Sequence, residues 1–275
     1  MPELPEVETF RRFLEKKVKG KKINKINLFF PKLIKKPYNY KKFPNFLVGL
    51  SIDEIKRKGK YLLFFLQKYV LIVHLRMEGK FIFENVENKN QLHCSMEFIF
   101  EDNKRLYYCD SRKFGTFELE LEKHYLENKG LKKLGLEPFD SKLTVSYLQK
   151  NWSKRTILIK TALLEQTVIA GIGNIYACEI LFLSNISPFQ KINTLNEKQL
   201  QKIITNLQKI MKKAIQLGGT TTKTFKVNER KGLFFKELKV YAKKNQKCFF
   251  CFDKILWIKI NNRGTFYCPS CQKKD

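Results

Sequence analysis

The residues whose type and spacing most directly indicate chemistry are four cysteines near the end of the sequence. Cys248 and Cys251 form one Cys-x-x-Cys pair, and Cys268 and Cys271 form a second. Two such pairs on adjacent turns can present four thiolates tetrahedrally to one Zn²⁺, and disulfide pairing is the weaker interpretation for a cytosolic protein. The pattern predicts one structural zinc ion. The other cysteines are expected to be small buried residues: Cys94, Cys109 and Cys178.

The first residues could form a second reactive centre. If Met1 is removed, Pro2 exposes a secondary amine. An amine near the N-terminus of a helix should bind its proton less tightly, because the helix dipole disfavours its cation, and it is then more nucleophilic near neutral pH. Glu3 and Glu6 follow closely and suit proton transfer. Alternatively, Pro2 and Pro5 only begin a helix, and the two glutamates cap it.

A glycine turn interrupts a helical pattern in the second half of the sequence. Gly171 and Gly173 allow a tight turn and a close approach of the backbone to a phosphate. A new helix opens at Asn174, and its N-terminus favours an anion. The motif therefore indicates phosphate binding, and an ordinary turn between two helices is the alternative.

The net charge favours a polyanionic partner. The sequence has 54 Lys and Arg residues against 26 Asp and Glu residues, a formal charge of +28. A lysine-rich codon bias explains part of this excess but would not suppress acidic residues. Nucleic acid is the favoured partner, bound mainly through phosphates with an affinity that falls as salt rises. The sequence lacks an apolar run of a membrane span's length and a signal-peptide profile, so we expect a cytoplasmic protein.

Periodicity indicates which elements position these groups. Val7, Phe10, Leu14 and Val18 recur at helical spacing, and Gly20 ends the run. From about residue 22 to residue 122, short β-branched and aromatic runs alternate with polar turns, which is typical of an antiparallel sandwich or barrel. The clearest of these runs are residues 61–66, 70–75, 96–100 and 105–109.

The second half of the sequence has a different pattern of apolar residues. Residues 134–138 are interpreted as a linker, residues 141–217 follow helical patterns, and residues 238–275 form a strand-rich module around the four cysteines. The expected fold class is therefore a multidomain α+β protein.

Seven segments, collinear over nearly the whole chain, resemble the family of formamidopyrimidine-DNA glycosylase and endonuclease VIII. They are residues 2–9 (PELPEVET), 58–62 (KGKYL), 74–79 (HLRMEG), 110–115 (DSRKFG), 171–176 (GIGNIY), 218–221 (GGTT) and 263–271 (RGTFYCPSC). The resemblance implies an N-terminal β-sandwich domain with a leading helix over residues 1–134, a helix-two-turn-helix domain over 135–237 and a zinc finger over 238–275.

The resemblance also implies a reaction. The amine of Pro2 would attack the sugar C1′ of an oxidised purine nucleotide, such as 8-oxoguanine or a formamidopyrimidine, and the resulting Schiff base would allow β- and δ-elimination of the flanking phosphates. Glu3 is the implied acid or base, with Glu6 supporting it. Lys60 is the cation that assists β-elimination, and Arg263 assists the second elimination.

Further residues are implied contacts with double-stranded DNA that contains oxidised bases or abasic sites. His93, Asn174 and Arg155 match phosphate contacts. The segment from Gly218 to Phe235 would close over an everted base. One departure from the family pattern is Glu165, where Asp is more frequent, and a second is Phe266, where His is frequent.

Three residues are implied to fill the space that a flipped nucleotide leaves. Met77 supplies a flexible apolar wedge, Arg112 a guanidinium for the orphaned base, and Phe114 an aromatic wedge. They match the branch that acts on purines. Met77 and Phe114 could instead belong to the core of the sheets.

Two other functions stay open at this point. One is an endonuclease VIII-like glycosylase for oxidised pyrimidines, and the other is a non-catalytic zinc-finger protein that binds damaged DNA. A glycosylase of either substrate class requires a free amine at Pro2, whereas a non-catalytic DNA-binding protein does not. A monomer is expected, because one chain with all three modules needs no second subunit to enclose a lesion.

Overall fold

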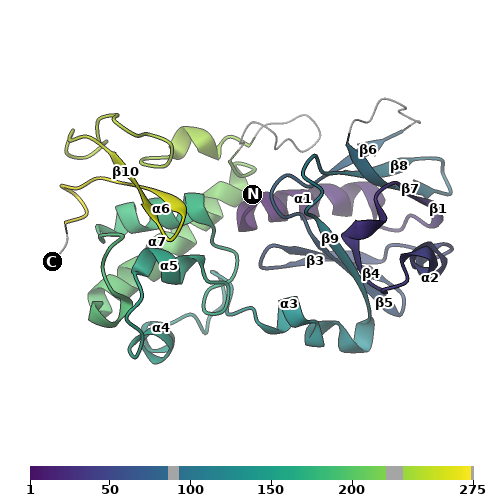
Figure 1. The fold of residues 1–275 in the computed structure, drawn as a ribbon, viewed down its shortest axis with the longest axis horizontal. Helices are drawn as coiled ribbons and strands as arrows, with labels where there is room; N and C mark the ends of the chain where they lie inside the picture. Colours follow the sequence, from purple (N-terminus) through teal and green to yellow (C-terminus); the bar gives the residue numbers. More distant parts are fainter. Residues whose placement is uncertain (86–92, 221–231, 274–275) are drawn as a thin grey trace. The chain divides into compact units, whose positions relative to one another are not determined.

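The computed structural model describes residues 1–85, 93–220 and 232–273. The chain forms two compact units, each with helices and strands (Figure 1). The first comprises Met1–Lys132 and Gly218–Gly232, and the second comprises Lys133–Leu217 and Leu233–Asp275. The expected α+β class is confirmed.

The first unit contains two stacked sheets. One has the strand order β2-β9-β5-β4-β3 and the other β1-β7-β8-β6, and every pairing is antiparallel except β2 with β9. Apolar side chains from both sheets form one core, so the expected sandwich is confirmed. The strands are β1 (Ile23–Leu28), β2 (Ile34–Lys36), β3 (Glu54–Lys58), β4 (Tyr61–Leu66), β5 (Tyr69–His74), β6 (Lys80–Glu84), β7 (Cys94–Phe100), β8 (Arg105–Cys109) and β9 (Thr116–Leu121).

The leading helix α1 (Leu4–Val18) packs against β3 and β4. Its four apolar residues at helical spacing are completely buried in the core of the sandwich, as the periodicity predicted. Lysines in its last turn suit the negative end of the helix dipole. Two short helices complete the unit: α2 (Phe43–Leu47) and α3 (Lys129–Lys132).

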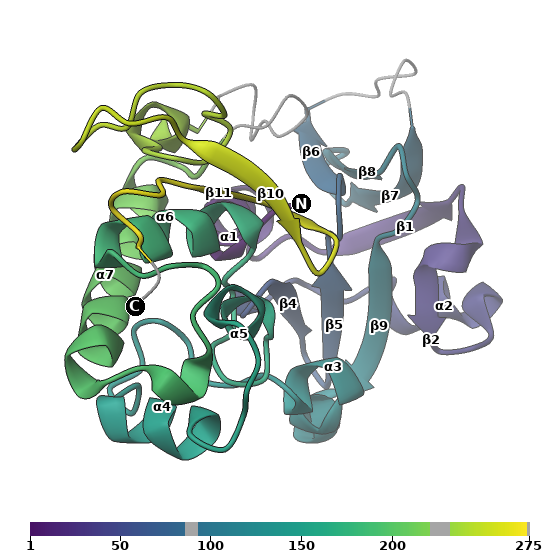
Figure 2. The same ribbon diagram turned by 60° about the vertical axis from the view of Figure 1, so that its left-hand side comes forward.

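The second unit is built around α6 (Asn174–Ser184) and α7 (Glu197–Gln216), which pack against each other (Figure 2). Asn196 begins α7 with a capping box, in which its side chain and that of Gln199 bond each other's backbone N–H. The helices α4 (Val145–Trp152) and α5 (Ile159–Leu164) pack against α7 and α6, respectively.

The segment interpreted as a linker belongs to the packing of the second unit. Leu136 pairs with Ile169 in an isolated parallel bridge, and a Cβ at Gly135 would lie 2.2 Å from the carbonyl oxygen of Val168. The backbone therefore approaches so closely that only glycine fits at position 135. The simple linker interpretation did not foresee this contact.

The C-terminal strands β10 (Leu256–Ile260) and β11 (Arg263–Tyr267) form an antiparallel hairpin beside α6. Glu179 of α6 is buried and accepts backbone N–H bonds from residues 239, 240 and 241 at 2.8 to 3.0 Å. Cys178 and Phe182 of α6 also share an apolar core with residues of the cysteine-rich module. One helix therefore anchors this module by polar and apolar contacts together.

Among the described residues, no helix combines the length and the apolar character needed to cross a membrane.

Candidate active site and metal centre

The start of α1 buries three of the residues predicted to react. Pro2 is buried, and Glu3 and Glu6 are each 2% exposed. Glu3 is the N-cap, and its side chain and that of Glu6 form a capping box, with Glu6 Oε2 accepting the Glu3 N–H at 2.9 Å. The capping interpretation of the two glutamates is therefore correct for this structure. Capping also places both carboxylates beside the amine end of the chain.

Glu6 has a second set of contacts, far away in the sequence. Its Oε1 accepts the backbone N–H of Thr220 at 2.7 Å and the hydroxyl of Thr220 at 3.0 Å. Gly219 has a φ of +79°, and a Cβ there would lie 2.6 Å from Glu6 Oε1. Glycine is needed at this position for conformation and for space. Glu6 thus connects the start of α1 to one end of the segment predicted to close over a base, of which residues 221–231 lie outside the described residues.

Lys60 brings a buried cation to the same cluster. It follows Gly59, which has a φ of 57°, in the turn between β3 and β4, and it is 6% exposed. Burial lowers the pKa of the amine at Met1, the carboxylates of Glu3 and Glu6 oppose this effect, and the charge of Lys60 lowers the pKa further. These four groups therefore interact electrostatically, and a lowered pKa makes a chain-terminal amine a better nucleophile.

A short loop presents two of the predicted wedge residues. Phe114 is 51% exposed, and the guanidinium carbon of Arg112 lies 4.7 Å from the centre of its ring. Met77 is half-buried and lies outside the core of the sandwich. The alternative that Met77 and Phe114 belong to the core of the sheets is therefore wrong.

Asp110 organises this loop and was not singled out in the sequence. It is 1% exposed and accepts the backbone N–H groups of Arg112, Phe114 and Gly115 at 3.1, 2.9 and 2.8 Å. An Asp at the start of a turn that ends in Gly was the available signal, because Asp side chains commonly bond the backbone a few residues onward. The carbonyl of His93 accepts the N–H of Asp110 at 3.1 Å, and the His93 side chain is exposed.

In the second unit, the structure brings together two residues predicted to bind DNA. Asn174 begins α6, and its Nδ2 donates to the carbonyl of Gly264 at 2.8 Å. Gly264 follows Arg263, which is exposed at the start of β11. Asn174 thus positions the turn that carries Arg263.

Gln166 holds the glycine turn before α6 and was also not predicted as a functional residue. Its Oε1 accepts the Gly171 N–H, and its Nε2 donates to the carbonyl of Ile172, both at 2.9 Å. The buried Lys160 supports the same region by donating to the carbonyl of Asn174 at 3.1 Å. A single Gln in a loop carries no distinctive sequence signal, so only the structure identifies this contact.

Arg155 is bound to an acidic neighbour in this structure. Its two terminal nitrogens contact the two carboxylate oxygens of Glu165 at 2.8 and 2.9 Å. Glu165 is one of the two positions at which the sequence departs from the family pattern. A bidentate pair of this kind competes with a phosphate for the guanidinium.

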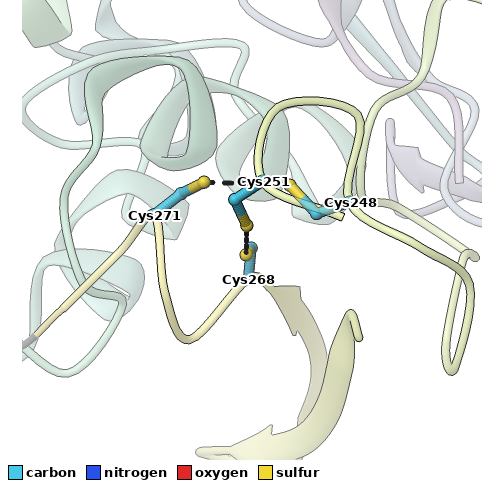
Figure 3. A group of neighbouring side chains, drawn as sticks. All are labelled: Cys248, Cys251, Cys268 and Cys271. Carbon is cyan, nitrogen blue, oxygen red and sulfur yellow. Dashed lines mark hydrogen bonds between the residues drawn. The ribbon is translucent and has the colours of Figure 1, made fainter. Parts of the chain in front are cut away.

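The four C-terminal cysteines converge as their spacing predicted (Figure 3). All four Sγ atoms lie within 4.8 Å of one another, with Cys248 to Cys271 at 3.8 Å and Cys251 to Cys268 at 3.3 Å. Tetrahedral thiolate ligands about 2.3 Å from a zinc ion would be roughly 3.8 Å apart. The donor set and its spacing therefore fit one tetrahedral metal ion.

Comparison with known proteins identifies two matching family models. Residues 1–117 match the model of the formamidopyrimidine-DNA glycosylase N-terminal domain, and residues 134–226 match the model of the formamidopyrimidine-DNA glycosylase H2TH domain. A Bacillus cereus protein named formamidopyrimidine-DNA glycosylase is 39% identical over 275 residues, with 100% of both chains covered.

Solved structures give the same comparison in three dimensions. The Lactococcus lactis Fpg in complex with DNA containing an abasic site superposes with a TM-score of 0.94 at 38% identity, over 99% of this chain and 100% of that chain. A complex of the Lactococcus lactis Fpg with DNA containing FAPY-dG gives a TM-score of 0.93 at the same identity and coverage.

Proposed function

Because this chain belongs to the formamidopyrimidine-DNA glycosylase family, it is a DNA glycosylase for oxidised purines in base-excision repair and an AP lyase, and we propose that the amine of Pro2 is its nucleophile. The observation that carries this proposal is the buried cluster at the start of α1. There the amine of Met1, whose pKa is lowered by burial, interacts with two carboxylates and one buried lysine, and Pro2 is the next residue. Removal of Met1 would make Pro2 the first residue.

The residues of this cluster divide the reaction between them. The Pro2 amine attacks C1′, the base leaves, and the Schiff base acidifies the C2′ protons, so that the 3′ phosphate leaves by β-elimination and the 5′ phosphate by δ-elimination. Glu3 transfers protons at the sugar. The Glu6 carboxylate accepts the backbone N–H of Glu3 and so holds Glu3 in place. Lys60 supplies a fixed positive charge for the departing phosphate.

We assign DNA contacts to both units. In the first, His93 binds a phosphate, and Met77, Arg112 and Phe114 fill the space left by the everted nucleotide. The exposure of Arg112 and Phe114, and the position of the half-buried Met77 outside the core of the sandwich, support this role, because a wedge must project from the protein surface.

In the second unit, Asn174 and Arg155 bind phosphates, and Arg263 contacts the backbone beside the lesion and assists δ-elimination. The bond from Asn174 to the Gly264 carbonyl supports a joint role for Asn174 and Arg263.

We infer that the metal of the cysteine cluster is a single structural zinc ion. A complete set of four thiolates leaves no open position for a substrate, which is typical of structural rather than catalytic zinc. The ion would hold the module that carries Arg263. We also propose that residues 1–134, 135–237 and 238–275 act as three functional modules, and that the protein works in the bacterial cytoplasm.

Borohydride trapping tests the nucleophile. The purified protein is incubated with an 8-oxoguanine:cytosine duplex and reduced, and the adduct is mapped by mass spectrometry. We expect DNA covalently attached to Pro2, and no adduct with an undamaged duplex. An adduct at a lysine instead would refute the assignment of Pro2.

A parallel duplex containing an oxidised pyrimidine tests the substrate class. Faster trapping on the oxidised pyrimidine would favour an endonuclease VIII-like activity. Tight binding to both lesions without trapping or cleavage of either would favour a non-catalytic damage-binding protein.

A further inference from the structure

Two cysteines outside the metal cluster lie opposite each other in the four-stranded sheet. Cys94 begins β7 and Cys109 ends β8, and the register of these antiparallel strands pairs the two residues directly. Cys109 is buried, as expected from the sequence, whereas Cys94 is half-buried, so the expectation of a buried Cys94 is wrong. One sulfur of the pair is therefore partly accessible to solvent.

The backbone bonding beside the pair defines its geometry. The carbonyl of His93, one residue before Cys94, accepts the N–H of Asp110, one residue after Cys109. Cys94 and Cys109 consequently form a non-hydrogen-bonded pair, next to a β-bulge between Cys94 and Met96. In regular pairs of this kind the Cα atoms are about 4.5 Å apart and the side chains approach closely. Disulfides span Cα separations of roughly 4.4 to 6.8 Å. The direct pairing of Cys94 with Cys109 therefore places the two residues within the range of strand spacings that a disulfide spans.

The electrostatic environment favours a thiolate on this pair. A hydrogen bond from the Cys94 thiol lowers the pKa of Cys109, and the charge of Lys80 lowers it further. Lys80 is paired with Cys109 from the other side, on β6. The same thiol–thiol interaction raises the pKa of Cys94, so the thiolate forms on Cys109 and Cys94 keeps its proton.

We propose that Cys94 and Cys109 form a reversible cross-strand disulfide on exposure to a hydroperoxide. In the first step, the thiolate of Cys109 attacks a hydroperoxide that enters beside the half-buried Cys94, an S–O bond forms as the O–O bond breaks, and the departing oxygen leaves as water (or an alcohol) after protonation. In the second, the partner thiol attacks the sulfenic sulfur, the S–S bond forms, the S–O bond breaks, and water leaves. Two thiols lose two electrons in total, and the hydroperoxide gains them. A dithiol reductant reverses the change.

The crosslink lies at the base of the Asp110–Gly115 loop. Asp110 directly follows Cys109, bonds the carbonyl of His93, and accepts three backbone N–H groups of its own loop. Closing the disulfide therefore locks the strand end from which the loop begins. Any consequence for lesion recognition rests on the proposed function of Arg112 and Phe114, whereas the crosslink itself does not.

Mass spectrometry under non-reducing conditions tests the modification. The metal-loaded full-length protein is treated with hydrogen peroxide, checked for metal release, and digested. We expect a linked peptide that joins Cys94 to Cys109, a loss of two free thiols, and recovery of both with dithiothreitol. Cys178→Ser is the matched control and should form the same link, while Cys94→Ser and Cys109→Ser should not. Irreversible oxidation of either thiol without a link, or a link to another cysteine, would overturn the proposal.

Hydrogen exchange tests the coupling to the loop separately. In the oxidised protein we expect severalfold slower exchange at the amides of Arg112, Phe114 and Gly115 than in the reduced protein, with no such change in Cys94→Ser. Unchanged exchange in a fully crosslinked sample would show that the disulfide does not restrain the loop. Neither readout depends on glycosylase activity, so failure here and failure of the proposed function are distinguishable.

Discussion

The cluster at the start of α1 and the cysteine cluster position their reactive groups by different means. The first collects Pro2, Glu3 and Glu6 from the chain start, Lys60 from a strand turn and Thr220 from a distant segment. The second takes all four thiols from one continuous stretch, residues 248–271. The α1 cluster therefore takes its groups from distant parts of one unit, whereas the cysteine cluster takes its thiols from two local turns, in a module that α6 anchors.

Burial separates the two regions as well. Glu3, Glu6 and Lys60 are nearly inaccessible, so their charges act in a medium of low dielectric constant and all three affect the pKa of the amine at Met1. Arg263, which the cysteine-rich module carries, is exposed. This contrast agrees with the roles that we propose, in which the first region performs the chemistry and Arg263 contacts the DNA backbone.

Blocking the amine at the start of the chain should lower the rate of lesion excision more than any of the changes that follow. We expect an uncleaved N-terminal extension to lower lesion excision by at least about 10³-fold, because it converts the nucleophile into an amide. The affinity for lesion-containing DNA should change little. Single-turnover cleavage and an equilibrium binding titration measure the two quantities. Proteolytic removal of the extension, leaving Pro2 first, is the control that should restore activity. Full activity of the extended chain would show that another group is the nucleophile.

Removing one thiol from the cysteine cluster should weaken DNA binding and leave the chemical step largely intact. In Cys248→Ser we expect loss of the metal and about 100-fold weaker DNA binding, because the module folds around the ion. Adduct formation at saturating enzyme should largely persist, since the amine cluster belongs to the first unit. Metal stoichiometry, DNA titration and borohydride trapping at high enzyme concentration test this. Cys94→Ser is the matched control that should keep the metal. A complete loss of trapping at saturation would contradict the separation of roles.

Replacing Lys60 should affect both the rate and its pH dependence. In Lys60→Met we expect about 100-fold slower strand cleavage. The charge of Lys60 lowers the pKa of the amine at Met1, and we expect it to act in the same way on the amine of Pro2, so that removing this charge raises the pKa of the nucleophile. Attack requires the neutral amine, and a higher pKa leaves less of it at a given pH. The acidic limb of the profile should move to higher pH, with a larger defect at pH 6.5 than at pH 8.5.

A pH–rate profile of single-turnover cleavage provides the measurement for Lys60→Met. Lys68→Met, in the exposed turn between β4 and β5, is the matched control. An acidic limb that stays in place in Lys60→Met would exclude an electrostatic action of Lys60 on the amine.

The smallest expected effect concerns Arg155 in the second unit. Glu165→Gln removes the carboxylate that binds the guanidinium of Arg155, and a partly exposed pair of this kind contributes up to about 1 kcal/mol. We expect two- to fivefold tighter DNA binding at low salt, and no gain when Arg155→Gln is combined with Glu165→Gln. Binding titrations at two salt concentrations measure this. Equal affinities of Glu165→Gln and the unchanged protein would argue against a phosphate contact by Arg155.

Local patterns in the sequence predicted several features correctly. The apolar spacing of α1, the strand runs of the sandwich and the convergence of four cysteines all depend on residues near one another in the chain. A helix period, a strand run and a Cys-x-x-Cys knuckle are short-range features, so the residue types suffice to identify them.

Contacts between distant segments could not be predicted in this way. The bond from Glu6 to Thr220 joins residues 214 positions apart, and the approach of Gly135 to Val168 depends on how two segments dock. The pairing of Cys94 with Cys109 depends on strand register, because a slip of one residue would turn the side chains of one strand to the other face. Asp110 and Gln166 have common residue types whose roles depend on which backbone groups surround them.

By itself, the sequence determined the family, the fold class, and the residue types of the reactive amine, the thiol set and the surplus positive charge. Only the tertiary structure decided that Glu6 connects two distant segments, that Arg155 is paired with Glu165, and that two further cysteines face each other. The physical reason is that residue types define which bonds are chemically possible, whereas burial and distance decide which of them form.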